Sequence, residues 1–369
     1  MKKTVDLNKL IQKINRVLDP IIPASDSTLA RQDFLHAAER SKAGRELASY
    51  YLVYFLLVDL LKFENLGQFE KVAWSIPIDY RGKAYLIEYR KMGVGVFVQD
   101  KLLDEPAAVE ITKKINRAIR IAEPYFDELA ENAITHSKVN LTNKHRPFFN
   151  KYLYFLSLYE KHCSNLNKQS HEQIQESIWL AIATIESFFS WSEHIFIHLA
   201  LLTGRITSGP QAINLISDDW DKKFKAALDI SNAEINKWFN ELTLIKKEIR
   251  NFVAHGGAGK NGEALYFHSG TGAVPVFLPH KRRSKKFILS DGLDFDPHTA
   301  IDPIKKFIDF LWSNDRKPAH AYICKTTLPI IFTYVSDGTY LDAMKSNRTM
   351  NQLIDHIEEI FDRSTDMDW

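Results

Sequence analysis

One long stretch decides the fold: SHEQIQESIWLAIATIESFFSWSEHIFIHLALL, residues 170–202. Its apolar side chains recur every three or four positions, which places them on one broad face of an α-helix. Ser170 and Gln173 have the spacing of a capping box at the start, and Gly204 stands where such a helix ends. The stretch therefore predicts a helix of roughly 30 residues and a protein built on helix packing.

The rest of the second half continues the helical pattern. A capping-box sequence at 231–234 precedes apolar residues at helical spacing, and Gly256 and Gly257 follow as residues that favour a helix end. This pattern predicts a helical bundle with a small β insertion after the helix that ends at the two glycines. Further helices are predicted at 141–166, 218–228, 299–314 and within 321–369, and short strands at 264–268, 273–278 and 285–290.

The first half has a different pattern. Residues 4–18 and 27–63 have helical spacing, whereas residues 74–100 alternate and are rich in β-branched and aromatic side chains. We expect two or three antiparallel strands in the latter segment, with a turn at 81–83 and a bulge or second bend at Gly93 and Gly95. A helix from Asp104 to about 135, interrupted near Pro124, completes an α+β unit.

The chain is thus predicted to be mainly α. We assign residues 1–140 to an N-terminal α+β domain with an accessory or regulatory role. Residues 141–315 form the helical domain with its β insertion, and residues 316–369 form a C-terminal helical extension.

The composition fits a globular protein of the cytoplasm. Apolar residues make up 45% of the 369 residues, and the net charge is only +2, so attraction to nucleic acid must come from local patches. The two cysteines, Cys163 and Cys324, form neither a disulfide framework nor a zinc site and fit a reducing compartment. The most apolar run, residues 50–61, is shorter than the ~20 residues that span a bilayer, so no membrane contact is expected.

The stretch IRNFVAHGG, residues 249–257, places an arginine, an asparagine and a histidine at a predicted helix end. A helix end by itself requires only the glycines. On a continuous helix, positions five apart are turned by ~140° and lie ~7.5 Å apart along the axis, so Arg250 and His255 would not share a face. They can meet if the backbone leaves the helix at His255, or if two copies of the helix meet across a two-fold axis.

These residue types suit the cleavage of a phosphodiester. Imidazole exchanges protons near neutral pH, and a guanidinium presents a fork of donors that matches phosphate oxygens. In RNA the nucleophile is already present as the 2′-hydroxyl, so the chemistry requires no metal ion and no cofactor.

RNFVAH, residues 250–255, is an R-x4-H motif with a polar residue after the arginine, and it resembles the signature of the HEPN superfamily. These helical domains occur in bacterial toxins, abortive-infection proteins and RNA-guided ribonucleases. The helix that ends at Leu202 resembles the long first helix of such domains. There an acidic residue, here Glu186, lies on the face that meets the motif helix. The resemblance covers about residues 150–315.

The resemblance implies a metal-independent endoribonuclease that acts as a homodimer with a composite site. Arg250 would hold the scissile phosphate, His255 would act as general acid or base, and Asn251 would orient the phosphate or the histidine. Glu186 would belong to the same catalytic group, and the products would carry 2′,3′-cyclic phosphate and 5′-hydroxyl ends. Such a protein would be a toxin or an antiviral effector of abortive infection, with an antitoxin or sensor as a further partner.

One subgroup of these toxins has a tyrosine two residues after the histidine, which a partner enzyme adenylylates. This chain has Gly257 at that position. We therefore do not expect that form of control.

A basic run follows the motif, and it contains Lys281, Arg282, Arg283, Lys285 and Lys286. Clustered cations suit an RNA backbone because binding releases counterions, so we expect RNA contact there. A solvated hairpin loop or a sorting signal would have the same composition.

Three other groups of residues have structural interpretations. Tyr80, Tyr85 and Tyr89 lie among cations but are interpreted as cross-strand packing partners. The basic face of the 105–135 helix, which includes Lys114, is interpreted as a solvated surface. The histidines at 194 and 198 are interpreted as packing at a helix interface.

Two other functions remain open. A non-catalytic RNA- or nucleotide-binding module would use the same arginine for a phosphate and leave RNA intact. A structural or interaction protein would use the motif to latch an interface and would have no affinity for RNA.

Overall fold

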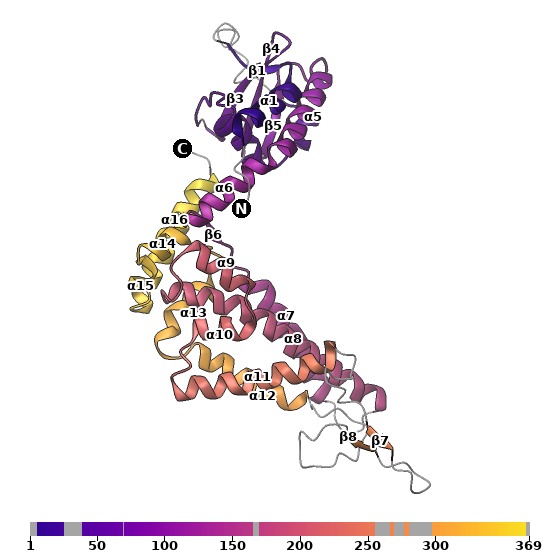
Figure 1. Cartoon of the computed structure of the whole chain (residues 1–369), viewed down its shortest axis with the longest axis vertical. Coiled ribbons are helices and arrows are strands. Elements are labelled where there is room, and N and C mark those ends of the chain that lie inside the picture. Colours follow the sequence, from indigo (N-terminus) through magenta and orange to yellow (C-terminus); the bar gives the residue numbers. More distant parts are fainter. Residues whose placement is uncertain are drawn as a thin grey trace. The chain divides into compact units, whose positions relative to one another are not determined.

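The computed structural model describes residues 6–25, 39–68, 70–164, 170–254, 266–268, 277–279 and 297–366, without the side chains of 248, 250–254, 365–366 and the two shortest ranges. The described chain is mainly helical with a small antiparallel sheet, as the sequence predicts. It divides into a first unit of residues 1–135 with 356–369 and a second unit of residues 136–355 (Figure 1). The second unit includes residues 316–355, which the sequence assigned to a C-terminal extension.

A five-stranded antiparallel sheet forms the centre of the first unit, in the order β1-β3-β4-β5-β2. Arg81 and Gly82 connect β3 to β4 in a tight turn, because both have positive φ and Asp79 Oδ1 accepts the Gly82 N–H at 2.8 Å. The expected turn at 81–83 is therefore confirmed. The strands are β1 (Ile21–Pro23), β2 (Glu39–Arg40), β3 (Val72–Tyr80), β4 (Lys83–Arg90) and β5 (Gly93–Val98).

One face of this sheet carries the larger core of the first unit. Tyr85 and Ile87 of β4 belong to it, together with apolar residues of α1 (Leu7–Leu18) and α5 (Glu105–Ile121). Ala84, Leu86 and Phe97 point to the opposite face and form a separate small cluster. The two helices lie beside the sheet in Figure 1, and α6 (Glu123–Thr135) follows α5 after the interruption expected near Pro124.

The expected continuous helix over 27–63 is wrong, because its described part contains several shorter elements. Residues 26–38 lie outside the described residues, and Glu39–Arg40 form β2. Then come a 3-10 turn η1 (Ala43–Glu46), the helix α4 (Tyr50–Tyr54) and its π-helical continuation η2 (Phe55–Leu60). The cause is contact with β5: a Cβ on Gly44 would lie 2.3 Å from the Val96 nitrogen, so the backbone here packs directly on the strand.

Gly93 and Gly95 fit the sheet differently from the expected bulge. They pair in regular register with Arg90 and Glu88, and the second bend lies just before them at residues 91–92. Their missing side chains make room for Arg40, whose guanidinium lies across β5 and donates to Met92 O at 2.8 Å and to Val94 O.

Gly95→Ala is expected to destabilise the first unit. Its Cβ would lie 2.5 Å from Arg40 Nε and 2.8 Å from Arg40 Cγ, so the whole arginine side chain would have to move and its bonds to β5 would be lost. We expect a loss of about 1–3 kcal/mol in unfolding free energy, measured by urea denaturation. The control is Gly95→Ala in an Arg40→Ala background, where the side chain that the new Cβ would meet is absent. An equal loss in both backgrounds would contradict the packing role of Gly95.

The second unit is a helical bundle built on the long hairpin of α7 (His145–Ser164) and α8 (His171–Leu202), which lie side by side in Figure 1. The capping box at Ser170 and Gln173 is present, and Gly204 follows α8 with a φ of 67°. The expected 30-residue helix is confirmed. The other helices are α9 (Gly209–Ser217), α10 (Trp220–Ala227), α11 (Ala233–Ala254), α12 (His298–Leu311), the 3-10 turn η4 (Asn314–Arg316), α13 (Lys317–Lys325), α14 (Phe332–Ser336) and α15 (Thr339–Ala343). The last helix, α16 (Asn347–Asp366), begins in the second unit, and its residues from His356 belong to the first.

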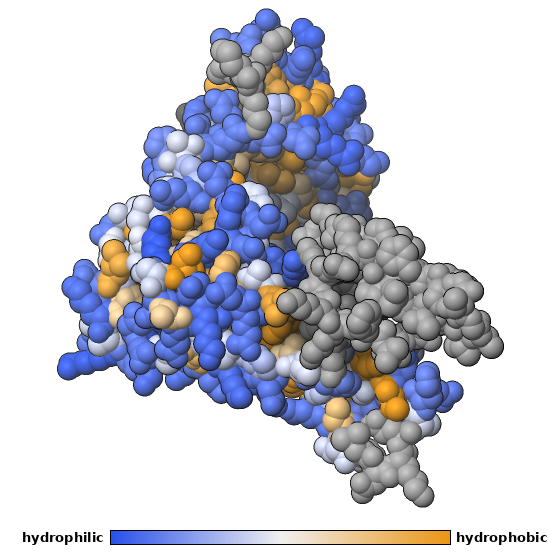
Figure 2. All heavy atoms as spheres, turned by 60° about the horizontal axis from the view of Figure 1, so that its bottom comes forward, coloured by the Kyte–Doolittle hydropathy of each residue, from blue (hydrophilic) through white to orange (hydrophobic). Residues whose placement is uncertain are grey.

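Aromatic side chains fill the core of this unit. Phe196 of α8 lies 5.6 Å from Trp220 and 5.1 Å from Phe224 between ring centroids, and Phe224 stacks on Phe307 of α12 at 5.9 Å. Trp220 Nε1 also donates to Ser192 Oγ at 2.8 Å, which satisfies the only polar group of that buried side chain. The described surface is mostly hydrophilic in the view of Figure 2, in keeping with this concentration of apolar groups inside.

Two short antiparallel ladders complete the described structure. β6 (Asn140–Leu141) pairs with β9 (Ile330–Ile331). β7 (Tyr266–His268) pairs with β8 (Phe277–Pro279), so two of the three strands expected after the motif helix are present. The third candidate, 285–290, lies outside the described residues.

Candidate functional site

The helix that carries the motif has its N-cap one residue later than expected, at Asn232 instead of Ser231. Asn232 Oδ1 accepts the N–H groups of Glu234 at 2.9 Å and Ile235 at 3.2 Å, so Asn232 caps α11 rather than Ser231. The buried residues Leu242, Ile245 and Ile249 then continue the helical spacing toward the motif. The sequence therefore predicted the helix and its buried face but misplaced its cap.

Aromatic contacts hold α11 against its neighbours before it reaches the motif. Phe239 lies 5.3 Å from Phe224 of α10, and Trp238 lies 5.8 Å from Phe307 of α12, between ring centroids. Lys246 lies over the Trp220 ring at 5.3 Å. The last turns of α11 are thus the continuation of a helix that the bundle core holds in place.

Arg250 and Asn251 lie in the final turn of α11, which extends through Ala254. The side chains of both residues and all of His255 lie outside the described residues. A helix C-terminus presents carbonyl groups with a partial negative charge, so its backbone does not attract a phosphate. Any anion held at this end must therefore be held by side chains.

Glu186 lies on α8, whose most extensive neighbours are α7, α10 and α12. Its side chain is exposed, while Ile185 and Ser187 on either side are buried. It has no hydrogen bond or ion pair to the side chains that the structure describes. Its position on the face toward the motif remains a prediction.

The basic run with Lys281, Arg282, Arg283, Lys285 and Lys286 lies outside the described residues.

The tyrosines among the cations of the first unit pack as expected. Tyr89 stacks on Tyr50 at 4.3 Å, and Tyr80 meets Tyr85 edge-on at 6.2 Å, between ring centroids. Lys114 of the basic helix face donates to Asp19 O at 2.6 Å, which ties α5 to the end of α1. These groups therefore have structural roles.

Three histidines, the buried His145 and His198 and the half-buried His194, form a cluster that the sequence predicted only in part. His194 and His198 of α8 lie 4.1 Å apart between ring centroids, and His194 Nε2 accepts the Lys144 backbone N–H at 3.0 Å. His145 of α7 joins them, and its Nδ1 accepts the Trp191 indole N–H at 3.0 Å. Burial lowers the pKa of His145 and His198 to about 4 and that of His194 to about 2. The other two rings add to the shift of His194, His145 adds to that of His198, and His320 and Arg146 add to that of His145. All three are neutral at physiological pH.

These rings are packing groups of the bundle. His145 accepts the Trp191 indole N–H, and His194 accepts the Lys144 backbone N–H. Within the described residues, no group of three or more His, Cys, Asp or Glu side chains is arranged to hold a metal ion.

The sequence missed a cationic pocket in the first unit. It lies where β2, β4 and β5 meet, and Arg40, Arg45 and Arg90 are among its lining residues. Arg40 and Arg45 come from one segment of the chain and Arg90 from another, and the sheet brings the two segments together. Gly93 and Gly95, which lie opposite Arg40 in the structure, were an indication of this site in the sequence.

Comparison with known proteins gave no relative. No family model, curated protein or solved structure matches this chain significantly. None of the described helices has the length and apolar character needed to cross a bilayer.

Proposed function

We propose that this chain is a metal-independent endoribonuclease of the HEPN type, a toxin or phage-defence effector whose site includes Arg250, Asn251 and His255. The observation that carries the proposal is the motif R-N-x3-H-G, placed so that its arginine and asparagine occupy the final turn of α11. Packing of α11 on α10 and α12 supports it, because a cleavage site needs its groups on a rigid element.

The proposed reaction is an intramolecular transesterification. The 2′-hydroxyl of RNA attacks the adjacent phosphorus, its proton goes to a base, and the bond from phosphorus to the 5′-oxygen breaks as that oxygen receives a proton. His255 would serve one of these proton transfers, and Arg250 would balance the charge that develops on the phosphate oxygens. The products are a 2′,3′-cyclic phosphate and a 5′-hydroxyl.

A homodimer explains how the two groups meet. Because α11 is helical through Ala254, a continued helix would turn position 255 by ~140° away from Arg250. Two copies of the helix across a two-fold axis would bring the arginine of one protomer to the histidine of the other. A departure of the backbone from the helix after Ala254 would achieve the same within one protomer.

The test is direct incubation of the purified full chain with end-labelled RNA in excess EDTA. The proposal predicts cleavage in the presence of the chelator and fragments that acquire a 5′-label from polynucleotide kinase without prior phosphatase treatment. Activity that requires an added divalent metal ion would contradict it, and so would fragments with 5′-phosphate ends.

The cationic pocket of the first unit favours a second candidate, a protein that binds RNA or a nucleotide without cleaving it. Such a protein would retard RNA in a gel and leave it intact. His255→Ala would then change neither property, whereas in a nuclease it would abolish cleavage and leave most of the binding.

A further inference from the structure

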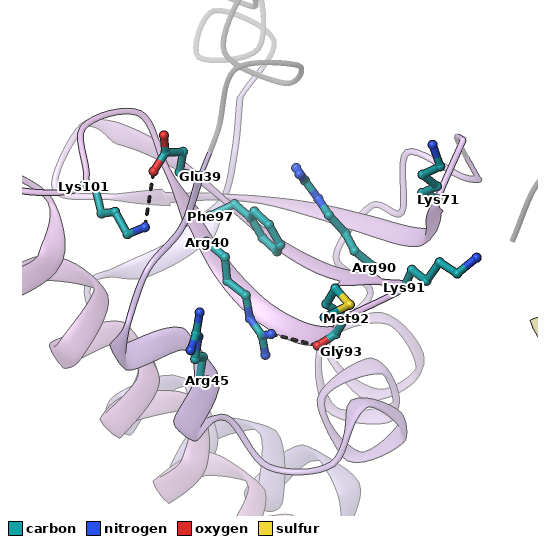
Figure 3. Close-up of a pocket in the computed structure, with 10 residues that line it drawn as sticks. All are labelled: Glu39, Arg40, Arg45, Lys71, Arg90, Lys91, Met92, Gly93, Phe97 and Lys101. Atoms are coloured by element: carbon teal, nitrogen blue, oxygen red, sulfur yellow. Dashed lines mark hydrogen bonds and ion pairs between the residues drawn. The ribbon is translucent and has the colours of Figure 1, made fainter. Parts of the chain in front are cut away.

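The cationic pocket lies on the face of the sheet opposite the main core of the first unit. It has a volume of about 790 Å³, which is the size of a small-molecule site. Six of its lining side chains are cationic and one is a carboxylate, in a chain whose net charge is +2. Figure 3 shows the lining residues, which are Glu39, Arg40, Arg45, Lys71, Arg90, Lys91, Met92, Gly93, Phe97 and Lys101.

Arg40 is built into the base of this pocket. It crosses Gly93 and Gly95, and its two terminal nitrogens donate to backbone carbonyls of Met92 and Val94. Its Nε is buried and has no hydrogen-bond partner. Burial and the neighbouring charge of Arg45 lower the pKa of Arg40, which records the cost of holding two guanidinium groups near each other.

Arg90 is held at the side of the pocket by two contacts. Its guanidinium carbon lies 3.8 Å from the centroid of the Phe97 ring, and its Nε donates to Glu88 Oε2 at 2.5 Å. Glu88 is buried and also accepts from Ser75 Oγ at 2.7 Å, so the carboxylate is fixed in turn. The terminal nitrogens of Arg90 have no partner among the described residues, which leaves them available to an anion.

The acidic groups nearby do not balance the remaining cations. Glu39 pairs with Lys101 at 3.3 Å, and Lys71 pairs with Glu70 at 3.0 Å. Arg45 and Lys91 have no ion pair with any residue that the structure describes. Three of the six lining cations, Arg40, Arg45 and Lys91, therefore lack a carboxylate partner among the described residues. Like charges gathered in one pocket repel one another, and a bound anion would relieve that repulsion.

We propose that this pocket binds the phosphate groups of a nucleotide, either free or as part of an RNA strand. Guanidinium groups match phosphate oxygens in geometry, and several cations within one cavity fit the charge density of adjacent phosphates. Met92 is 84% exposed and lies at the pocket, where its side chain offers an apolar contact for a base or ribose. A pocket of this volume has room for a nucleotide.

The experiment measures binding to the full chain carrying His255→Ala, so that any cleavage of an RNA probe is slow, and gel electrophoresis confirms that the probe is intact at the end of each measurement. Arg45→Ala/Lys91→Ala is compared with Lys13→Ala/Arg16→Ala, which removes two exposed cations from α1 of the same unit. The probes are ATP, a 12-nucleotide single-stranded RNA with a 5′-triphosphate, the same RNA with a 5′-hydroxyl, tripolyphosphate and a hexaglutamate peptide.

We expect the pocket variant to bind ATP or RNA about tenfold or more weakly at moderate salt, and the α1 variant to bind like the parent. Pocket-dependent binding of ATP identifies a free nucleotide, and pocket-dependent binding of RNA alone identifies a strand. The proposal is overturned if both variants bind equally. It is also overturned if tripolyphosphate or hexaglutamate binds as tightly as the nucleotides. Binding is measured separately from cleavage, so the proposed role of the pocket can be wrong while the proposed nuclease function is right.

Discussion

His255→Ala is expected to slow RNA cleavage by about 10²- to 10⁴-fold, because a positioned proton donor or acceptor contributes that much to a transition state. Arg250→Ala is expected to lower the rate by about 10²- to 10³-fold. The end of α11 presents carbonyl groups, so no backbone donor of the helix can replace the lost guanidinium. The measurement is the single-turnover rate with excess protein over labelled RNA.

Lys247→Ala is the matched control for these variants. It removes an exposed cation from α11 one turn before the motif, and it should leave the rate close to that of the parent. In a growth assay, expression of the parent should slow the host, and either motif variant should restore growth. If both motif variants cleave RNA as fast as the parent, the proposed nuclease function is wrong.

A mixing experiment distinguishes the two ways in which Arg250 and His255 can meet. Arg250→Ala and His255→Ala chains, inactive alone, are co-expressed and purified together. If the site is composite, each mixed dimer contains one site with both native residues, so about a quarter of the parental activity should return. If both groups come from one protomer, the mixture should stay inactive.

Acidification from pH 7.5 to 5.0 is expected to destabilise the second unit by several kcal/mol. His145 and His198 have a pKa of about 4 in the folded protein, compared with an ordinary value of 6.5, and His194 has a pKa of about 2. As the pH falls, these three histidines therefore bind protons in the unfolded chain at pH values where they remain neutral in the folded chain. The contribution of the neutral histidines to the free energy of unfolding is fully present above pH 6.5 and decreases as the pH drops toward 4. At pH 5 the loss is roughly 2 kcal/mol for each histidine.

The main cause is burial of the rings, which disfavours their charged form, and the loss of two acceptors adds to it. A proton on Nδ1 of His145 would leave the buried Trp191 N–H without a partner, and a proton on Nε2 of His194 would do the same to the Lys144 N–H. Urea denaturation followed by circular dichroism at both pH values measures the effect.

His145→Asn tests the contribution of one ring. Asparagine places an oxygen near the position of Nδ1, so it keeps an acceptor for Trp191 but does not titrate. The variant should be less stable than the parent at pH 7.5 and should lose about 2 kcal/mol less on acidification. His171→Asn, at an exposed position, should have the parental pH dependence. A parental pH dependence for His145→Asn would refute the assignment.

Local sequence patterns determined the long helices. The apolar spacing and the capping box of 170–202 predicted α8, and the same reasoning predicted α11 apart from its cap. They also singled out Arg250, Asn251 and His255 as a candidate site. These features depend on residues that are neighbours along the chain, so the sequence contains the information directly.

Only tertiary contacts decided the features in which distant segments meet. The expected helix at 27–63 gave way to β2 and short helices because Gly44 packs on β5. The cationic pocket exists because the strand order brings Arg40, Arg45 and Arg90 together, and the histidine cluster exists because α7 packs on α8. In the pocket and in the histidine cluster, the charges and hydrogen-bonding groups that interact are close in space but distant along the chain. The periodicity of hydrophobic residues does not reveal such contacts.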